Sequence, residues 1–151
     1  MVVLRAVFFI LILGCASKFN PESNTFINST ESYYTLWSSP IRDGGSGYSV
    51  YIVLDKNLDL NTKHIEIQGI YFKDKYCKLK SLGDQKYQCS ILMNENRETN
   101  FSPPIVLGTS KIEKSPFTIE GDDAVVVYIE NKKRKYIKIT MLWKKMQHLP
   151  M

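Results

Sequence analysis

The chain has 151 residues and a mass of 17.4 kDa, a size typical of one domain. Hydrophobic residues make up 44% of it and charged residues 23%, which excludes disordered and collagen-like chains. The net charge of +5 is too small for a dedicated nucleic-acid-binding protein, and two His and three Cys offer few ligands for a metal enzyme. We therefore expect no nucleic-acid partner and no cofactor.

Residues 1–14 have the pattern of a secretory leader. Arg5 is the only charged side chain in this segment, and an unbroken apolar run (AVFFILIL) follows it over residues 6–13. A helix of that length would measure roughly 12 Å, against about 30 Å of membrane hydrocarbon. The run is therefore too short to span a bilayer, but it fits the apolar segment of a signal peptide.

The leader ends in Ile12-Leu13-Gly14-Cys15, which resembles the lipobox of bacterial lipoproteins. The resemblance implies cleavage just before Cys15, lipidation of that residue, and the lipid bilayer as a partner. A triacylated cysteine carries several chains and would hold firmly. In that family, Asp after the cysteine retains a protein at the inner membrane. Here the residue is Ala16, so the resemblance favours the outer membrane of a cell envelope, on its periplasmic or surface side.

Residues 15–32 are expected to form the lipidated cysteine and a flexible tether, because Ser, Asn, Thr and Glu dominate this stretch. Residues 33–147 are expected to form a single β domain, because the apolar period changes to two. Strands are predicted over residues 33–37, 48–54, 64–72, 76–80, 86–93, 105–107, 117–119, 123–130 and 135–143. Together they predict an all-β fold, an antiparallel β-sandwich or small β-barrel of about eight short strands.

Three local features refine this fold prediction. Gly69 interrupts a strand and indicates a bulge or a close approach of backbone. Residues 131–134 separate two strands and predict a hairpin turn. In the last predicted strand, alternation places one set of apolar side chains on the core face: Ile137, Ile139, Met141 and Trp143.

Cys77 and Cys89 form the only possible cysteine pair once Cys15 is lipidated. A hairpin centred on Gly83 would place them directly opposite each other, at a separation that a disulfide can bridge. An exported compartment permits such a bond. We therefore predict a Cys77–Cys89 disulfide, with two buried thiols as the alternative.

The glycine-rich segment 43–47 (DGGSG) lacks the lysine of a phosphate-binding loop and leads into a strand. Trp37, Arg42 and Tyr48 surround it. Aromatic and arginine side chains around a flexible loop suit contact with a peptide or a glycan. These three residues are therefore the candidate ligand contacts, with a simple flexible turn as the alternative.

Two other charged segments have weaker functional interpretations. Residues 55–61 place oxygen side chains at alternate positions and Glu66 is twelfth counted from Asp55, but Leu60 replaces the glycine of a calcium-binding loop, so we predict no metal site. Residues 132–145 carry seven basic and no acidic side chains. This run is either a patch for anionic lipids and other polyanions or a sheet edge that lysines protect from aggregation.

Catalytic residues are not evident. Neither His64 nor His148 belongs to a pattern such as G-x-S-x-G, and no productive carboxylate pair can be assigned. We predict a small, membrane-anchored, exported lipoprotein with a non-catalytic binding or envelope-accessory role, in contact with envelope proteins or glycans. A periplasmic ligand-binding module or inhibitor of a lytic enzyme is one alternative, and a hydrolase that uses His64 is another.

Overall fold

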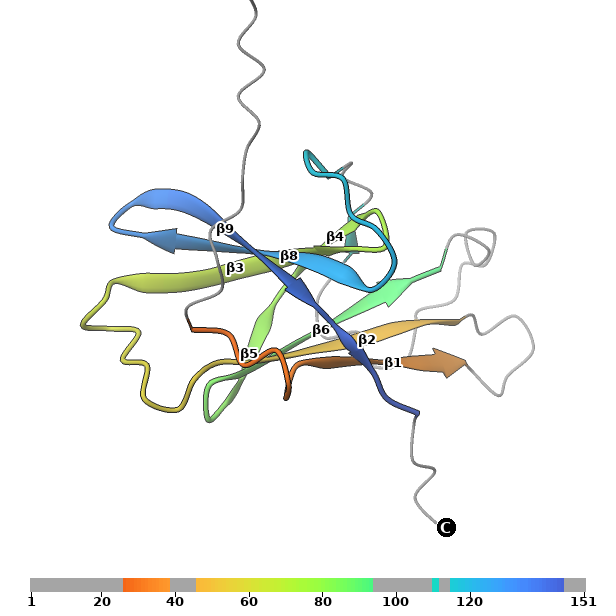
Figure 1. The fold of residues 1–151 in the computed structure, drawn as a ribbon, viewed down its shortest axis with the longest axis horizontal. Helices are drawn as coiled ribbons and strands as arrows, with labels where there is room; N and C mark the ends of the chain where they lie inside the picture. Colours follow the sequence, from red (N-terminus) through yellow and green to blue (C-terminus); the bar gives the residue numbers. More distant parts are fainter. Residues whose placement is uncertain (1–25, 39–45, 94–109, 112–114, 146–151) are drawn as a thin grey trace, which may run out of the picture.

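A computed structural model of the chain describes residues 26–38, 46–93, 110–111 and 115–145. These residues contain ten strands and no helix, arranged in two five-stranded sheets that pack face to face (Figure 1). The predicted all-β fold is confirmed, and the architecture is the predicted β-sandwich.

Sheet I has the strand order β10-β1-β2-β6-β5. The short edge strand β10 runs parallel to β1, and the other neighbours are antiparallel. Its strands are β1 (Tyr33–Ser38), β2 (Ser46–Val53), β5 (Lys80–Gly83), β6 (Lys86–Leu92) and β10 (Leu142–Trp143).

Sheet II has the order β7-β4-β3-β8-β9 and is antiparallel throughout. Its strands are β3 (Ile65–Phe72), β4 (Lys75–Lys78), β7 (Ser110–Lys111), β8 (Asp123–Glu130) and β9 (Lys133–Thr140). The β8–β9 turn is confirmed: Asn131 and Lys132 have φ of 49° and 64°, as a tight two-residue hairpin requires.

The chain passes from sheet II to sheet I at two single buried residues. Leu79 separates β4 from β5, and Met141 separates β9 from β10. Two predicted strands, over residues 76–80 and 135–143, are therefore each divided between the sheets. The prediction that Trp143 is part of the core is wrong: it pairs with the inward-facing Tyr34, but the edge strand β10 leaves it 55% exposed.

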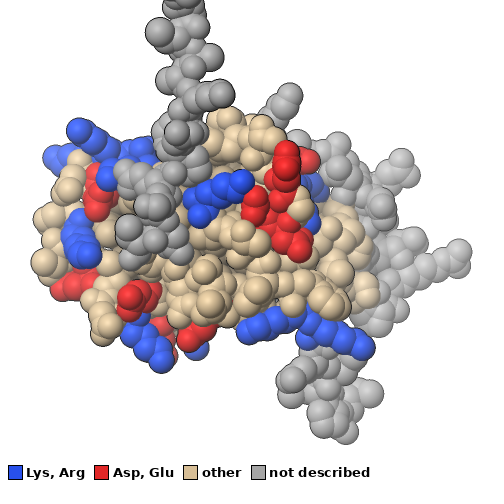
Figure 2. All heavy atoms as spheres, viewed as in Figure 1, with Lys and Arg blue, Asp and Glu red and all other residues tan. Residues whose placement is uncertain are grey.

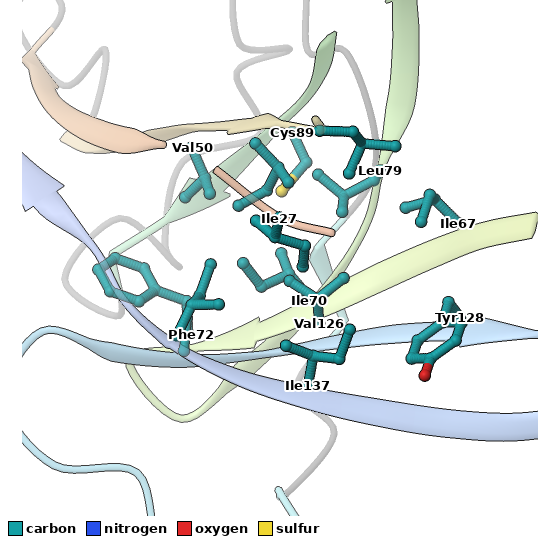
Figure 3. Close-up of a cluster of buried hydrophobic side chains, with 14 of the residues drawn as sticks. Ile27, Val50, Ile67, Ile70, Phe72, Leu79, Cys89, Val126, Tyr128 and Ile137 are labelled. Carbon is teal, nitrogen blue, oxygen red and sulfur yellow. The ribbon is translucent and has the colours of Figure 1, made fainter. Parts of the chain in front are cut away.

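The main core fills the space between the sheets (Figure 3). Alternation puts one side of each long strand inward, as with Val50 and Ile52 on β2 and Ile137 and Ile139 on β9. Near Gly69 the alternation shifts, because the β3–β8 register slips between Ile67 and Gly69. The predicted bulge at this glycine is therefore confirmed.

A second, smaller apolar cluster lies on the outer face of sheet II. Tyr71, Val125 and Val127 are buried there, and Phe117 and Ile119 pack against them. The predicted strand over residues 117–119 is wrong, since this segment forms a covering layer without ladder hydrogen bonds. Within the ranges given above, no such layer covers the outer face of sheet I.

The described domain begins before Tyr33. Phe26 and Ile27 are buried in the main core, and Ile27 forms a β-bridge with Leu54. The Ser32 hydroxyl, fully buried, accepts a hydrogen bond from the Val53 backbone N–H at 3.0 Å. The predicted tether is therefore wrong for residues 26–32, where two apolar side chains in a polar stretch suffice to bind it to the core. Residues 15–25 lie outside the described ranges.

Candidate functional site

The structure does not unite the predicted ligand contacts. Trp37 and Tyr48 are on neighbouring strands, but Trp37 pairs with Gly47 and Tyr48 pairs with Leu36, so their side chains leave opposite faces of sheet I. The Tyr48 ring points inward and contacts Tyr34 and Phe72 edge-on at centroid distances of 5.9 and 5.8 Å. Arg42, like Cys15, lies outside the described residues. A single aromatic site around the glycine-rich loop therefore has no support from the described part.

Cys77 and Cys89 are both buried free thiols, so the predicted disulfide is wrong. The reason is the crossing at Leu79: β4 pairs with β3 in sheet II, whereas β5 pairs with β6 in sheet I. The two cysteines consequently belong to different sheets instead of one hairpin. Burial, together with the neighbouring Cys77 thiol, raises the pKa of Cys89 well above its usual value, which keeps this thiol protonated and unreactive.

The best-formed surface site is on the outer face of sheet I. Tyr33 and Tyr51 are directly opposed on β1 and β2, and their rings stack at 4.7 Å with an interplanar angle of 19°. The Lys144 ammonium lies 4.0 Å from the centre of the Tyr33 ring, a cation–π contact. On the other side, the Gln88 amide donates a hydrogen bond to the Tyr51 hydroxyl at 3.1 Å.

This tyrosine pair borders a hollow of about 220 Å³, which we call the tyrosine hollow. Leu82 and Lys86 come to it from β5 and β6, and Glu31 is its single acidic lining residue among those described. A second hollow of about 470 Å³ adjoins it, sharing Glu31, Val53 and Lys86. The result is an open depression with apolar and cationic walls, to which Glu31 and, in the second hollow, Asp84 add acidic groups.

Sequence reasoning missed this site. Tyr33 and Tyr51 are recognisable in the sequence as outward-facing partners only once the β1–β2 register is known. Lys144 reaches them only because the chain changes sheet at Met141. One sequence feature could have pointed to this face: the segments that form the five strands of sheet I contain no Asp or Glu.

A polar cluster closes one side of the sandwich between β1 and the segment before β8. The Tyr34 hydroxyl donates a hydrogen bond to Asp122 at 2.8 Å, and the Lys73 ammonium contacts the same carboxylate oxygen at 2.9 Å. Hydrogen bonds from Lys73 and Tyr34 lower the pKa of Asp122. Burial, and then the bond to Asp122, raise the pKa of Tyr34 to about 12. The cluster joins the two sheets and keeps Tyr34 neutral.

Replacing Tyr34 with phenylalanine is expected to lower the free energy of unfolding by roughly 1–2 kcal/mol at neutral pH. Because the pKa of Tyr34 rises from 10.0 to about 12 on folding, its contribution is complete below pH 10 and is lost as the pH rises towards 12. The depressed pKa of Asp122 acts oppositely, adding stability above its unfolded pKa and losing it in acid. Urea unfolding followed by circular dichroism, carried out from acidic pH up to about pH 12, measures both effects. Tyr33→Phe is the matched control, and equal losses in both variants would contradict the prediction.

The structure explains the segment that resembles a calcium-binding loop, residues 55–66, and His64 without a metal or catalytic site in the described part of the chain. The Asp59 carboxylate accepts hydrogen bonds from the backbone N–H of Asn61 and from the Thr62 hydroxyl, which lower its pKa and use its oxygens within a turn. The described part of the chain has no cluster of metal-binding side chains. His64 is exposed and shares a hollow of about 440 Å³ with Glu66, but no serine, threonine or cysteine is among the described residues that line it.

The basic C-terminal run does not form one patch. Lys135 pairs with Glu130 and Lys138 with Asp123, both at 2.7 Å on sheet II, whereas Lys144 lies on sheet I. Figure 2 shows charges of both signs on the upper part and at the lower left of this view, with Lys and Arg along the lower right edge, near where Figure 1 places β1 and the last coloured part of the chain.

Comparisons with known proteins give no assignment: no family model, no curated protein and no solved structure matches this chain. Among the described residues, the structure has no helix long and apolar enough to cross a membrane.

Proposed function

We propose that the protein is an exported lipoprotein, anchored by lipid on Cys15, whose β-sandwich has a non-catalytic binding or accessory role at the cell envelope. The observation that carries this proposal is the apolar run that ends in Leu13-Gly14-Cys15. Phe26, the first described residue, is already buried in the domain, so the segment between it and Cys15 is short. At no more than about 3.6 Å per residue, it would hold the domain within roughly 40 Å of the membrane.

The structure supports a binding role better than a catalytic one. His64 has a carboxylate in the same hollow, but no hydrogen bond joins the two in the described region, and the hollow offers no side-chain nucleophile. The tyrosine hollow is lined by two aromatic rings, apolar side chains, two lysines and Glu31, and the Gln88 amide is bound to one of the rings. Such groups can hold a ligand by stacking, hydrogen bonds and charge. The alternatives of an inhibitor centred on the glycine-rich loop and of a hydrolase have no comparable support.

Intact-mass measurement of the native protein, extracted from membranes of a producing bacterium, tests the anchor. We expect a chain that begins at Cys15 and carries added acyl mass. A Cys15→Ala variant should show no acyl mass and should leave the membrane fraction, while a Cys89→Ala variant, which keeps the lipobox, should stay lipidated. An unmodified native chain, or one cut elsewhere, would contradict the proposal. Separation of inner and outer membranes then tests the outer-membrane location that Ala16 favours.

A further inference from the structure

We propose that the outer face of sheet I, around the tyrosine hollow, binds the head groups of an anionic lipid bilayer. The inference deepens the proposed function, because a lipid on Cys15 would hold this face near a membrane. It concerns a second contact, made by the folded domain itself.

The first argument is the composition of the face. Leu142 is paired with Tyr33, so its side chain lies on the outer face, where it is 44% exposed. Leu82, at the opposite edge of the sheet, is 49% exposed and lines the hollow. Tyr33 and Tyr51 lie between these leucines. Tyrosines with exposed aliphatic side chains match the region where water meets the acyl chains of a bilayer.

The second argument is charge. Lys86 and Lys144 both line the tyrosine hollow, and Lys80 is opposite Gln88 on the same face. None of these three lysines has a carboxylate partner within the described ranges. By contrast, Lys135 and Lys138 on sheet II are paired with acids. Unpaired lysines beside exposed apolar side chains are suited to phosphate groups, because their stems can stay in the apolar layer while the ammonium groups reach the head groups.

The third argument is that the two outer faces differ. On sheet II, Phe117 and Ile119 pack over the apolar centre of the outer face and shield it from solvent. On sheet I, the described residues leave Leu82 and Leu142 in contact with solvent. Phe26, the first described residue, and Glu31 line another hollow of about 460 Å³, and Glu31 also lines the tyrosine hollow. The end of the domain that meets the tether is thus close to the proposed membrane face.

Vesicle binding by a chain without lipid tests this inference separately from the anchor. The chain is residues 15–151 with Cys15→Ala, which keeps every residue that the structure describes. We expect co-sedimentation with vesicles of equal parts phosphatidylglycerol and phosphatidylcholine, and at least tenfold weaker binding to phosphatidylcholine alone. Because each lysine near an anionic surface gives about fivefold in affinity, Lys86→Gln with Lys144→Gln should weaken binding roughly 30-fold.

The matched control is Lys132→Gln with Lys133→Gln, which removes the same charge from the exposed β8–β9 end of sheet II. It should change binding less than threefold. Leu82→Ser with Leu142→Ser should also weaken binding, and circular dichroism checks the fold of each variant. Equal losses in the two lysine pairs, no preference for anionic vesicles, or binding only to isolated cell-wall glycan would overturn the inference. A lipidated protein whose domain fails this test would leave the anchor proposal intact.

Discussion

Replacing Gly47 with alanine is expected to destabilise the domain by about 3 kcal/mol, a large effect for one methyl group. A Cβ at this position would collide with the Ile91 backbone carbonyl and lie 2.8 Å from the Trp37 ring. The carbonyl belongs to β6, next to β2 in sheet I, and cannot turn aside as a side chain could. Urea unfolding followed by circular dichroism measures the loss.

Two further variants make this prediction specific. Ser49→Ala, on the same strand and the same outward face, should change the free energy of unfolding by less than about 0.5 kcal/mol. Combining Gly47→Ala with Trp37→Ala should not restore stability, because the clash with the Ile91 carbonyl remains. A Gly47→Ala chain as stable as the Ser49→Ala chain would show that β2 and β6 can separate here at little cost.

Truncation of Phe72 to alanine is expected to cost about 4 kcal/mol. Its side chain is fully buried at the end of β3, and its ring contacts Tyr34 and Tyr48 from sheet I at 4.9 and 5.8 Å. The truncation therefore removes contacts between the sheets as well as apolar burial. Urea and thermal unfolding measure the effect. Leu82→Ala, at a half-exposed position, is the control and should cost under about 0.5 kcal/mol; a similar loss in both variants would contradict the assignment of the core.

Local sequence patterns were sufficient to predict the fold class and most long strands. Alternation identified β3 and β8 almost to the residue, because each lies between clear turn signals and buries one or both faces. The turn at Asn131 and the bulge at Gly69 were also predictable, since both depend on backbone conformations that few residue types adopt.

The sheet crossings were not predictable from local patterns. The alternation of apolar and polar residues runs up to Leu79 and up to Met141, and it does not show that the strand changes its hydrogen-bonding partner there. A period of two shows which side chains are buried but not which sheet buries them. The expected disulfide and the expected burial of Trp143 were wrong for this reason. The tyrosine hollow was missed for the same reason, because Lys144 reaches Tyr33 only after the second crossing.

The parallel pairing of β1 with β10 has a consequence for how the chain folds. Tyr33 pairs with Leu142, close to the opposite end of the described chain, whereas sheet II contains hairpins such as β3–β4 and β8–β9 that join sequence neighbours. Loop-closure entropy makes distant pairings late events, so the β1–β10 pair is expected to form after these hairpins. During synthesis from the N-terminus, β1 would form before its last partner strand exists, and its edge would be open to other chains until β10 is made.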